Sequence, residues 1–349
     1  MVNLKSIIGV DVHGKKILLR ADLDVPVRGS QIADDTRLSA WFPTLEYLLN
    51  QKAKVIIVGH LGRPEGKDDK YSLKPVAEWI SKQFRIQSAE FRIETRSGFN
   101  GWVISENVFL LENLRFDSGE EGNDEEFSKK LASLSDIYVN DAFASSHRAH
   151  ASIVGVTKYL PNYAGLRLQR EVEELSKVLN SPKRPLVVII GGAKIETKLP
   201  LVEKMHSFAD YVLVGGEIAE NDKVLLKVQH EKLTGKRSIL LVADSNENLK
   251  DITPKSAENF VQIIQNAKSV VWNGPMGVTE EKENQNGTNI LAEGIVQTSA
   301  DTIVGGGDTL SFLKEKNLLD KFSFVSTGGG AMLEFLSGEK LPGLEALEK

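Results

Sequence analysis

The stretch LVVIIGGAKIETK, residues 186–198, decides the fold of this chain. Its first five residues, Leu186 to Ile190, are apolar without alternation, which is typical of a strand covered on both faces in a parallel sheet. Gly191 and Gly192 follow, and two glycines allow a sharp turn and the close approach of another molecule. A proline two residues after the stretch predicts that a helix begins near Leu199.

Two lysines of the same stretch, Lys194 and Lys198, come just before this predicted helix. Free backbone N–H groups, the helix dipole and two ammonium groups would meet at one edge of the sheet, which favours an anion and most simply a phosphate. A tight turn with two solvated lysines explains the stretch equally well. The choice between the two depends on the rest of the chain.

The composition is that of an ordinary globular protein. Its 349 residues predict two domains, because one hydrophobic core rarely serves so many. The net charge of −5 and the pI of about 5.8 argue against nucleic acid as a partner. The chain has no cysteine, which excludes disulfides, thiol catalysis and cysteine-ligated metals. We find no signal peptide and no membrane span, so we expect a cytoplasmic protein.

Apolar runs of strand length recur along the whole chain, and segments of helical period separate most of them. This alternation predicts an α/β fold with mainly parallel sheets. The strands are too many for one open sheet, so two doubly wound sheets fit best, with a closed eight-stranded barrel as the alternative. The predicted strands are Ile17–Leu19, Val55–Val58, Val108–Leu111, Ile137–Val139, Leu186–Ile190, Tyr211–Val214, Ile239–Val242, Val270–Trp272, Thr302–Val304 and Phe322–Val325.

A helix is predicted over Gly165–Leu179, between the two series of strands. Its apolar residues recur at helical spacing and form one stripe, and Glu173 and Lys177 are placed to pair one turn apart. We interpret this helix as a bridge between two domains. The stripe consists of Leu168, Val172, Leu175 and Leu179.

Arginine and histidine follow the strands of the first half. In open α/β sheets, ligands bind beyond the carboxyl ends of the strands, and arginine holds phosphate and carboxylate with paired hydrogen bonds. We therefore expect a basic site there for a small, multiply charged anion, although any one of these arginines could instead form a surface ion pair. The segments are Arg20–Pro26, Gly59–Pro64, Glu112–Arg115 and Asn140–His150, joined by the loop that carries Arg37.

Glycine follows the strands of the second half, in the segments 191–194, 214–217, 272–277, 305–309 and 326–330. Glycine at these positions exposes backbone N–H groups, as phosphate-binding loops do. Asp308 is either a helix cap or a ligand of Mg²⁺ on a nucleotide phosphate. Its neighbouring glycines favour magnesium.

Several other sites are disfavoured. His147 and His150 have the spacing of metal ligands, but no third ligand stands at a suitable distance along the chain. The P-loop signature and the dinucleotide signature G-x-G-x-x-G are both absent, which weakens the reading as a nicotinamide-dependent dehydrogenase.

The residues match a known family, because the sequence resembles phosphoglycerate kinases. The matching blocks lie in family order over nearly the whole chain. They are RADLDVP (20–26), DDTR (34–37), GHLGRP (59–64), SLKPVAE (72–78), LLENLRF (110–116), EEFSKKLASLSDIYVNDAF (125–143), HRAHAS (147–152), KRPLVVIIGGAKIETK (183–198), VVWNGPMGV (270–278), IVGGGDT (303–309), VSTGGGAMLEFL (325–336) and LPG (341–343).

The resemblance implies two Rossmann-like, doubly wound domains joined by a helix, with a central cleft that closes on the substrates. The implied limits are 1–164 with 335–349 for the phosphoglycerate-binding domain, 165–179 for the helix and 180–334 for the nucleotide-binding domain. The implied enzyme is a monomer that transfers a phosphoryl group reversibly from 1,3-bisphosphoglycerate to MgADP, giving 3-phosphoglycerate and MgATP.

The resemblance also implies the site residues. Arg37, Lys194, Lys198, Gly306 and Gly307 would be catalytic. The phosphoglycerate would contact Asp22, Leu23, Asp24, Arg37, His60, Leu61, Gly62, Arg63, Arg115 and Arg148. The nucleotide would contact Gly192, Ala193, Lys194, Lys198, Gly215, Gly216, Asn273, Glu280, Gly306, Gly307, Asp308 and Thr309, with Asp308 on Mg²⁺ and Glu280 on the ribose.

The sequence departs from the family pattern at a few places. Asp24 replaces the usual Asn and adds a negative charge beside an anionic substrate, unless a nearby arginine neutralises it. The nucleotide side differs more, because the segment from Glu217 to Thr253 is altered and shortened. A kinase with changed base preference and a catalytically weakened binder of phosphorylated metabolites are therefore the alternatives.

Overall fold

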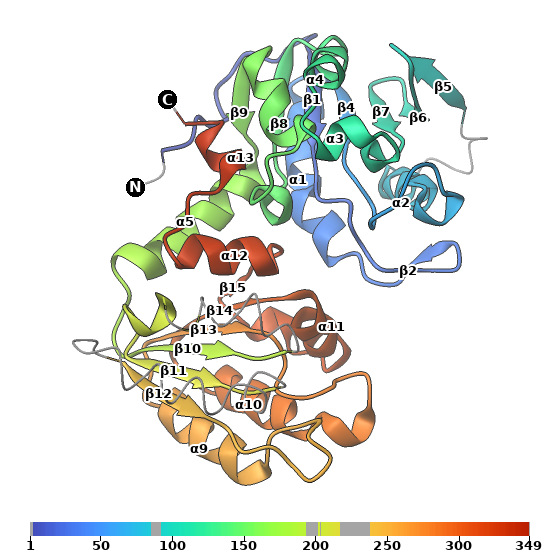
Figure 1. Cartoon of the computed structure of the whole chain (residues 1–349). Coiled ribbons are helices and arrows are strands. Elements are labelled where there is room, and N and C mark those ends of the chain that lie inside the picture. The colour runs from blue at the N-terminus through green and yellow to red at the C-terminus, as the bar shows by residue number, and fades with distance from the viewer. Residues whose placement is uncertain (1–2, 85–91, 193–201, 203, 217–237, 349) are drawn as a thin grey trace. The chain divides into compact units, whose positions relative to one another are not determined.

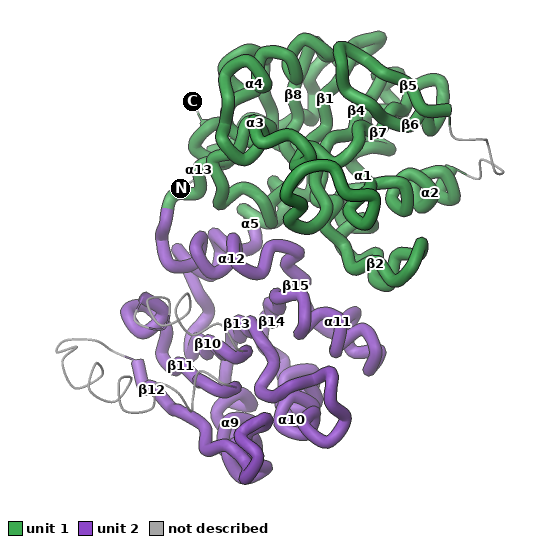
Figure 2. The backbone as a smooth tube through the Cα atoms, turned by 45° about the vertical axis from the view of Figure 1, so that its right-hand side comes forward, with its two compact units in different colours: residues 1–173, 340–349 green, residues 174–339 purple. Residues whose placement is uncertain are grey.

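The structure is a computed structural model that describes residues 3–84, 92–192, 202, 204–216 and 238–348. The chain forms two compact units, which are coloured separately in Figure 2. Unit 1 is Met1–Glu173 with Lys340–Lys349, and unit 2 is Glu174–Glu339. The boundary between them falls inside helix α5 (Leu166–Asn180) (Figure 1). The implied domain limits and the central cleft stay predictions.

In its described part, unit 1 is built on a seven-stranded sheet with the order β5-β6-β7-β4-β1-β8-β9 (Figure 1). The strands from β7 to β9 are parallel, whereas β5 and β6 add to this sheet in antiparallel pairs. The bounds are β1 (Lys16–Arg20), β4 (Lys54–Val58), β5 (Ile93–Arg96), β6 (Phe99–Ser105), β7 (Val108–Leu111), β8 (Ile137–Asn140) and β9 (Asn162–Ala164).

The central strands of unit 1 are buried on both faces, as their unbroken apolar runs predict. Ile17 and Leu19 pack into one core together with residues of α1 and α2. Leu18 points to the opposite face, and its neighbours in register, Ile56 and Tyr138, are buried there too. Hydrophobic residues therefore hold this sheet from both sides, which leaves the strand ends as the place for polar groups.

The helices of unit 1 include two long ones, α1 (Thr36–Asn50) and α2 (Lys74–Gln83), which contribute Leu38, Trp41 and Ile80 to the core. Shorter helical segments and a small hairpin also belong to the unit. They include α3 (Ser118–Glu121), α4 (Glu125–Ala132), α13 (Pro342–Glu345), the 3-10 turn Leu114–Phe116, the π-helical turn Ala151–Gly155, and the hairpin of β2 (Val27–Arg28) and β3 (Gln31–Ile32).

Unit 2 is built on a six-stranded parallel sheet with the order β12-β11-β10-β13-β14-β15 in the part that is described. Its core combines strand residues such as Val187 and Trp272 with helix residues such as Phe260 and Leu291. The bounds are β10 (Leu186–Ile190), β11 (Tyr211–Val214), β12 (Ile239–Val242), β13 (Ser269–Asn273), β14 (Asp301–Gly305), β15 (Phe324–Val325), α9 (Pro254–Ile264), α10 (Asn286–Val296), α11 (Gly307–Glu315) and α12 (Gly329–Leu336).

The two separate sheets exclude the single eight-stranded barrel. The strand predicted over Phe322–Val325 is shorter than expected, because the 3-10 turn Leu319–Lys321 occupies the chain up to Phe322. The pair predicted between Glu173 and Lys177 is wrong, because the Lys177 ammonium lies 2.9 Å from Glu174 Oε1.

The C-terminal segment lies against unit 1. The backbone N–H of Gly343 donates to the carbonyl of Ser146 at 2.8 Å, and Leu344 and Leu347 are buried. Glu348 forms an antiparallel bridge with Leu4. Both ends of the described chain therefore belong to unit 1.

Candidate active site

The carboxyl end of β1 carries two aspartates that behave differently. Asp22 is 4% exposed and accepts hydrogen bonds from the backbone N–H of Ala144 at 2.9 Å and the hydroxyl of Ser145 at 3.0 Å. Burial raises the pKa of Asp22, and the neighbouring Arg37 and Arg20 oppose that rise. Asp22 is thus tied to the loop after β8, so its position links two strand ends.

Asp24 lies half-buried beside Arg37, which stands in the first turn of α1. Arg37 Nη1 donates to the Asp24 carbonyl at 2.6 Å and lies 3.7 Å from the Asp24 carboxylate. The other carboxylate oxygen accepts the N–H of Gly62 at 2.9 Å. An arginine and a backbone donor therefore offset the extra negative charge that distinguishes this chain at position 24.

Arg20 is fully buried at the end of β1 and was not assigned a role from the sequence. Its Nε donates to Ser152 Oγ at 2.8 Å, and the same hydroxyl donates to Glu120 at 2.5 Å. Glu120 is also fully buried, and it accepts the N–H of Ser152 at 2.9 Å. This carboxylate is the buried counterpart of the Arg20 guanidinium, because an isolated buried charge would be very costly.

The proton on His60 is placed by its neighbour. Arg20 Nη2 lies 3.0 Å from His60 Nδ1, and a guanidinium can only donate. Nδ1 must therefore accept, and neutral His60 carries its proton on Nε2. Burial and then the positive charge of Arg20 lower the pKa of His60 well below its ordinary value, so the ring stays neutral near pH 7.

Arg115, on the 3-10 turn after β7, is 5% exposed and only partly satisfied. Its Nη1 donates to the Gly62 carbonyl at 2.6 Å, and its Nε lies 2.9 Å from Glu121. Its Nη2 is buried and has no hydrogen-bond partner among the described residues. Such a donor is a candidate for binding an anion, since buried polar groups are nearly always paired.

Positive charge accumulates around these groups. Burial lowers the pKa of Arg115, and the like charges of Arg148 and Arg20 act in the same direction. Arg148 is half-buried and donates to His147 at 3.2 Å, whereas Arg63 is exposed. An anion would relieve this repulsion.

The loop residues Leu23 and Leu61 are buried in the core, so only their backbones are available to a ligand. Gly62 has φ of +64°, and a Cβ there would lie 2.4 Å from the Tyr71 ring. His147 and His150 belong to the basic cluster. No group of three or more metal-binding side chains occurs in the described part of the chain, so the histidine pair is not part of such a group.

In unit 2, the predicted glycine loops meet at the carboxyl edge of the sheet. A Cβ on Gly191 would lie 2.2 Å from the Pro275 carbonyl oxygen, and one on Gly216 would lie 2.7 Å from the backbone nitrogen of Gly192. The N–H of Gly192 donates to the Pro275 carbonyl at 2.8 Å. The loops after β10, β11 and β13 therefore touch through their backbones, which leaves no room for side chains.

The loop after β14 joins the same edge. A Cβ on Gly329 would lie 2.8 Å from the Cα of Gly306, and Asn273 Nδ2 donates to the Gly329 carbonyl at 3.1 Å. Thr309 is fully buried and its hydroxyl accepts the N–H of Gly274 at 3.1 Å. Gly215 follows strand β11, and a Cβ there would lie 2.5 Å from Met276 Sδ. The ends of β10, β11, β13, β14 and β15 thus form one surface built mostly of backbone.

Asp308 is exposed in the first turn of α11. The cap position of this helix is Gly306, with φ of +98°, so Asp308 is not the capping residue. A single exposed carboxylate at a helix N-terminus fits Mg²⁺ that is held mainly by phosphate oxygens and water.

Other predicted nucleotide residues are less informative. Glu280 is exposed after β13, and Gly307 is exposed at the start of α11. Ala193, Lys194 and Lys198 lie outside the described residues, as does the predicted start of a helix at Leu199, whereas Val202 and residues 204–206 are helical.

Known proteins resemble the chain over its full length. The sequence model of the family described as phosphoglycerate kinase matches residues 7–239 and 221–339. This chain belongs to the phosphoglycerate kinase family. Phosphoglycerate kinases of Dictyoglomus turgidum and Pelotomaculum thermopropionicum are 39% and 37% identical to it over 387 residues. These matches cover 97% and 98% of this chain, and 96% and 98% of the relatives.

Solved structures agree. The phosphoglycerate kinase from Coxiella burnetii has a TM-score of 0.80 at 34% identity and covers 99% of both chains. The phosphoglycerate kinase from Pyrococcus horikoshii OT3 has a TM-score of 0.81 at 30% identity and covers 99% of this chain and 98% of its own.

Membership of the phosphoglycerate kinase family confirms several predictions. The two-domain α/β fold class is confirmed, and so is the enzyme class, a phosphotransferase of glycolysis with a carboxyl group as acceptor. The alternatives, a weakened binder and a dehydrogenase, receive no support. The 387 aligned positions exceed the 349 residues of this chain, so these relatives carry segments that it lacks. None of the described helices is long and apolar enough to cross a bilayer.

Proposed function

We propose that this chain catalyses reversible phosphoryl transfer from 1,3-bisphosphoglycerate to MgADP, giving 3-phosphoglycerate and MgATP. The observation that carries the proposal is the buried, incompletely satisfied Arg115 within an arginine cluster at the strand ends of a family member. A doubly charged phosphate and a carboxylate are the anions that such a cluster suits.

Unit 1 would hold the phosphoglycerate. Its arginines would bind the phosphate and carboxylate, and His60 would donate from Nε2, because Arg20 occupies Nδ1. Leu23, Leu61 and Gly62 would contribute backbone. The proposed set is Asp22, Leu23, Asp24, Arg37, His60, Leu61, Gly62, Arg63, Arg115 and Arg148, with Arg20 and Glu120 as positioning residues.

Unit 2 would hold the nucleotide. The phosphates would lie on the glycine loops, whose N–H groups bind anions, and Mg²⁺ at Asp308 would neutralise phosphate charge when bound. The proposed set is Gly192, Ala193, Lys194, Lys198, Gly215, Gly216, Asn273, Glu280, Gly306, Gly307, Asp308 and Thr309, with Glu280 on the ribose.

The chemistry asks for charge stabilisation and positioning. The acceptor is an oxyanion from either direction, so no general base is required. Arg37 would hold the carboxyl group that gives or takes the phosphoryl group. Lys194, Lys198 and the N–H groups near Gly306 and Gly307 would stabilise the charge on the group in transfer.

A coupled assay with 3-phosphoglycerate, Mg²⁺ and ATP, repeated with GTP, tests the proposal. We expect turnover with ATP, and Lys198→Ala should lower kcat far more than it raises the KM for 3-phosphoglycerate. Turnover with GTP alone would show that the enzyme prefers guanine, and the altered segment Glu217–Thr253 would be the place to look for the cause. Folded protein that binds 3-phosphoglycerate yet turns over neither nucleotide would refute the kinase.

The state of assembly and the location belong to the same proposal. We propose a cytoplasmic monomer, as the family resemblance implies. Size-exclusion chromatography with light scattering, with and without both substrates, measures the molar mass and so tests for a monomer. A stable dimer would refute this part of the proposal.

A further inference from the structure

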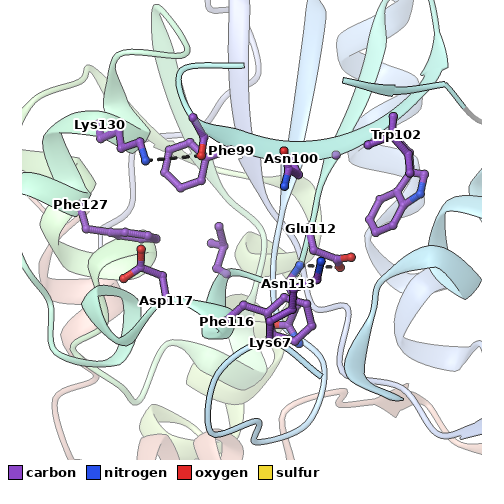
Figure 3. A pocket seen from close by; sticks show the side chains of 14 residues that line it. Lys67, Phe99, Asn100, Trp102, Glu112, Asn113, Phe116, Asp117, Phe127 and Lys130 are labelled. Carbon is purple, nitrogen blue, oxygen red and sulfur yellow. Dashed lines mark hydrogen bonds between the residues drawn. The ribbon is translucent and has the colours of Figure 1, made fainter. Parts of the chain in front are cut away.

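Unit 1 contains a cavity of about 320 Å³ beside the antiparallel strand β6, apart from the basic cluster (Figure 3). Its floor is the segment from Glu112 to Phe116, and α4 lies along one side. The Arg115 side chain between these floor residues does not line the cavity, because its Nη1 reaches Gly62 instead. The principal side chains around it are Lys67, Phe99, Asn100, Trp102, Phe127 and Lys130.

The walls of the cavity are aromatic and fixed in place. The rings of Phe99 and Phe127 meet edge to face, with centroids 5.5 Å apart. Phe127 and Trp102 are 6% and 5% exposed, so neither ring is free to turn away. Rings held in this way offer flat apolar surface at little cost in side-chain entropy, which suits a planar ligand.

The carboxylates that line the cavity already have partners. Glu112 accepts the N–H groups of Leu73 and Asn113, each at 2.8 Å, and the hydroxyl of Ser72 at 3.0 Å. Asp117 accepts the N–H of Gly119 at 2.9 Å. Glu112 and one oxygen of Asp117 are therefore already bonded to donors of the chain.

The lysines at the cavity are less engaged. Lys130 Nζ makes one long hydrogen bond of 3.5 Å to the Gly98 carbonyl and lies 4.6 Å from the Phe99 ring centroid. Burial raises the pKa of Glu112, and the positive charge of Lys67 opposes that rise, so Lys67 already acts on a carboxylate of the lining. Figure 3 shows the Lys130 ammonium beside the Phe99 ring, at the side of the cavity. The Lys130 ammonium is therefore a positive group at the aromatic wall of the cavity.

We propose that this cavity binds a small planar aromatic anion, such as an aromatic carboxylate. Its ring would lie against Phe99 and Phe127, and its acidic group would reach the Lys130 ammonium. The amide of Asn100 faces the middle of the cavity (Figure 3), where it would contact the ligand edge. The site is separate from the proposed phosphoglycerate site and does not depend on the proposed function.

The probe is 1-naphthoate, with the neutral 1-naphthylmethanol as its control, in saturation-transfer NMR and calorimetry on the full chain. We expect a Kd on the order of 0.1–1 mM for the acid and at least about fivefold weaker binding of the alcohol. No binding of the acid at about 5 mM, or equal binding of both compounds, would overturn the proposal.

Three variants locate the probe. Lys130→Gln should weaken binding about fivefold, and Asn100→Trp should abolish it by filling the cavity. Lys129→Gln removes the same charge from the same helix, but Lys129 pairs with Glu125 away from the cavity, so binding should not change. Circular dichroism and thermal melts check folding.

Equal binding to Asn100→Trp and the unaltered protein, or displacement of naphthoate by 3-phosphoglycerate, would place the probe elsewhere and overturn the proposal. A loss of binding in Lys129→Gln that equals the loss in Lys130→Gln would do the same.

Discussion

The two predicted half-sites solve the same problem, holding an anion, in opposite ways. In unit 1 the groups are long charged side chains, and buried partners such as Glu120 and Ser152 hold them still. In unit 2 the described loops pack through their backbones, and Gly191, Gly216 and Gly329 lie too close to neighbouring loops to carry a side chain. The first half-site should therefore suffer from removal of side chains, and the second from their addition.

The largest effect should come from Arg37→Ala. This guanidinium lies beside Asp24, and in our proposal it holds the carboxyl group that gives or takes the phosphoryl group, so kcat/KM should fall about 10³-fold. The coupled assay measures it, with Arg28→Ala as an exposed control on β2. Near-full activity of Arg37→Ala would contradict the claim that the half-site in unit 1 depends on its charged side chains.

Gly191→Ala should have the next largest effect. The new methyl group would lie 2.2 Å from the Pro275 carbonyl oxygen, so a backbone loop must move. We expect ADP affinity to fall about tenfold and the free energy of unfolding to fall by about 1–3 kcal/mol. Calorimetry and urea unfolding measure the two.

Gly330→Ala is the matched control, because a Cβ at Gly330 meets nothing within 4 Å. If Gly191→Ala binds ADP as Gly330→Ala does, close backbone packing does not shape this half-site.

Asp141→Asn should change how the stability of unit 1 depends on pH. Asp141 is buried, and its Oδ1 accepts the N–H of Leu168 in α5 at 2.9 Å. Burial raises the pKa of Asp141 from 3.8 to about 7. The folded state therefore keeps a proton that the unfolded state loses. This contribution to stability is full below pH about 4 and disappears as the pH rises through about 7.

The test is urea unfolding at several pH values between 4 and 8. A Trp272→Phe background removes the tryptophan of the unit 2 core, so fluorescence reports on Trp41, Trp79 and Trp102 of unit 1. Asp141→Asn should flatten the decline with pH, because asparagine keeps the acceptor and cannot ionise. Parallel pH profiles for the two proteins would contradict the prediction. Asp22 and Glu120 also have raised pKa values, so some slope should remain.

The smallest effect should come from Asp24→Asn. The amide oxygen keeps the acceptor for Gly62, Arg37 keeps its bond to the backbone carbonyl of residue 24, and the lost charge no longer competes with the substrate for Arg37. Because the pair of Asp24 and Arg37 is half-exposed, removing its negative charge should lower the KM for 3-phosphoglycerate only about two- to fivefold. A higher KM would show that the carboxylate positions Arg37 rather than competing for it.

The fold was predictable where strands consist of unbroken apolar runs. The runs Val108–Leu111, Leu186–Ile190, Tyr211–Val214 and Ile239–Val242 coincide with strands of the structure. Strands β5 and β6 were missed, because FNGWVIS mixes polar residues and glycine with apolar ones and β5 is largely exposed. Sequence periodicity does not reveal a strand whose residues neither alternate regularly nor form an apolar run.

The sequence allowed us to predict the site residues that directly follow strands. It did not allow us to predict the buried residues that hold them in place. His60 and Arg115 follow apolar runs, and their position after a strand identifies them as candidates for ligand binding. Arg20 had the same signal but no assigned role. Its partners Ser152 and Glu120 come from segments more than 90 residues away, and no local pattern announces them. Only the folded chain shows which nitrogen of His60 carries the proton.

The return of the C-terminal segment to unit 1 affects the order of folding during synthesis. Residues 340–348 leave the ribosome after all of unit 2, yet Leu344 and Leu347 fill the interior of unit 1 and Glu348 pairs with Leu4. The first 173 residues therefore cannot complete their core, and part of their apolar surface stays uncovered, until the second unit has been synthesised. Unit 2 has every residue of its own sheet by then and can finish first.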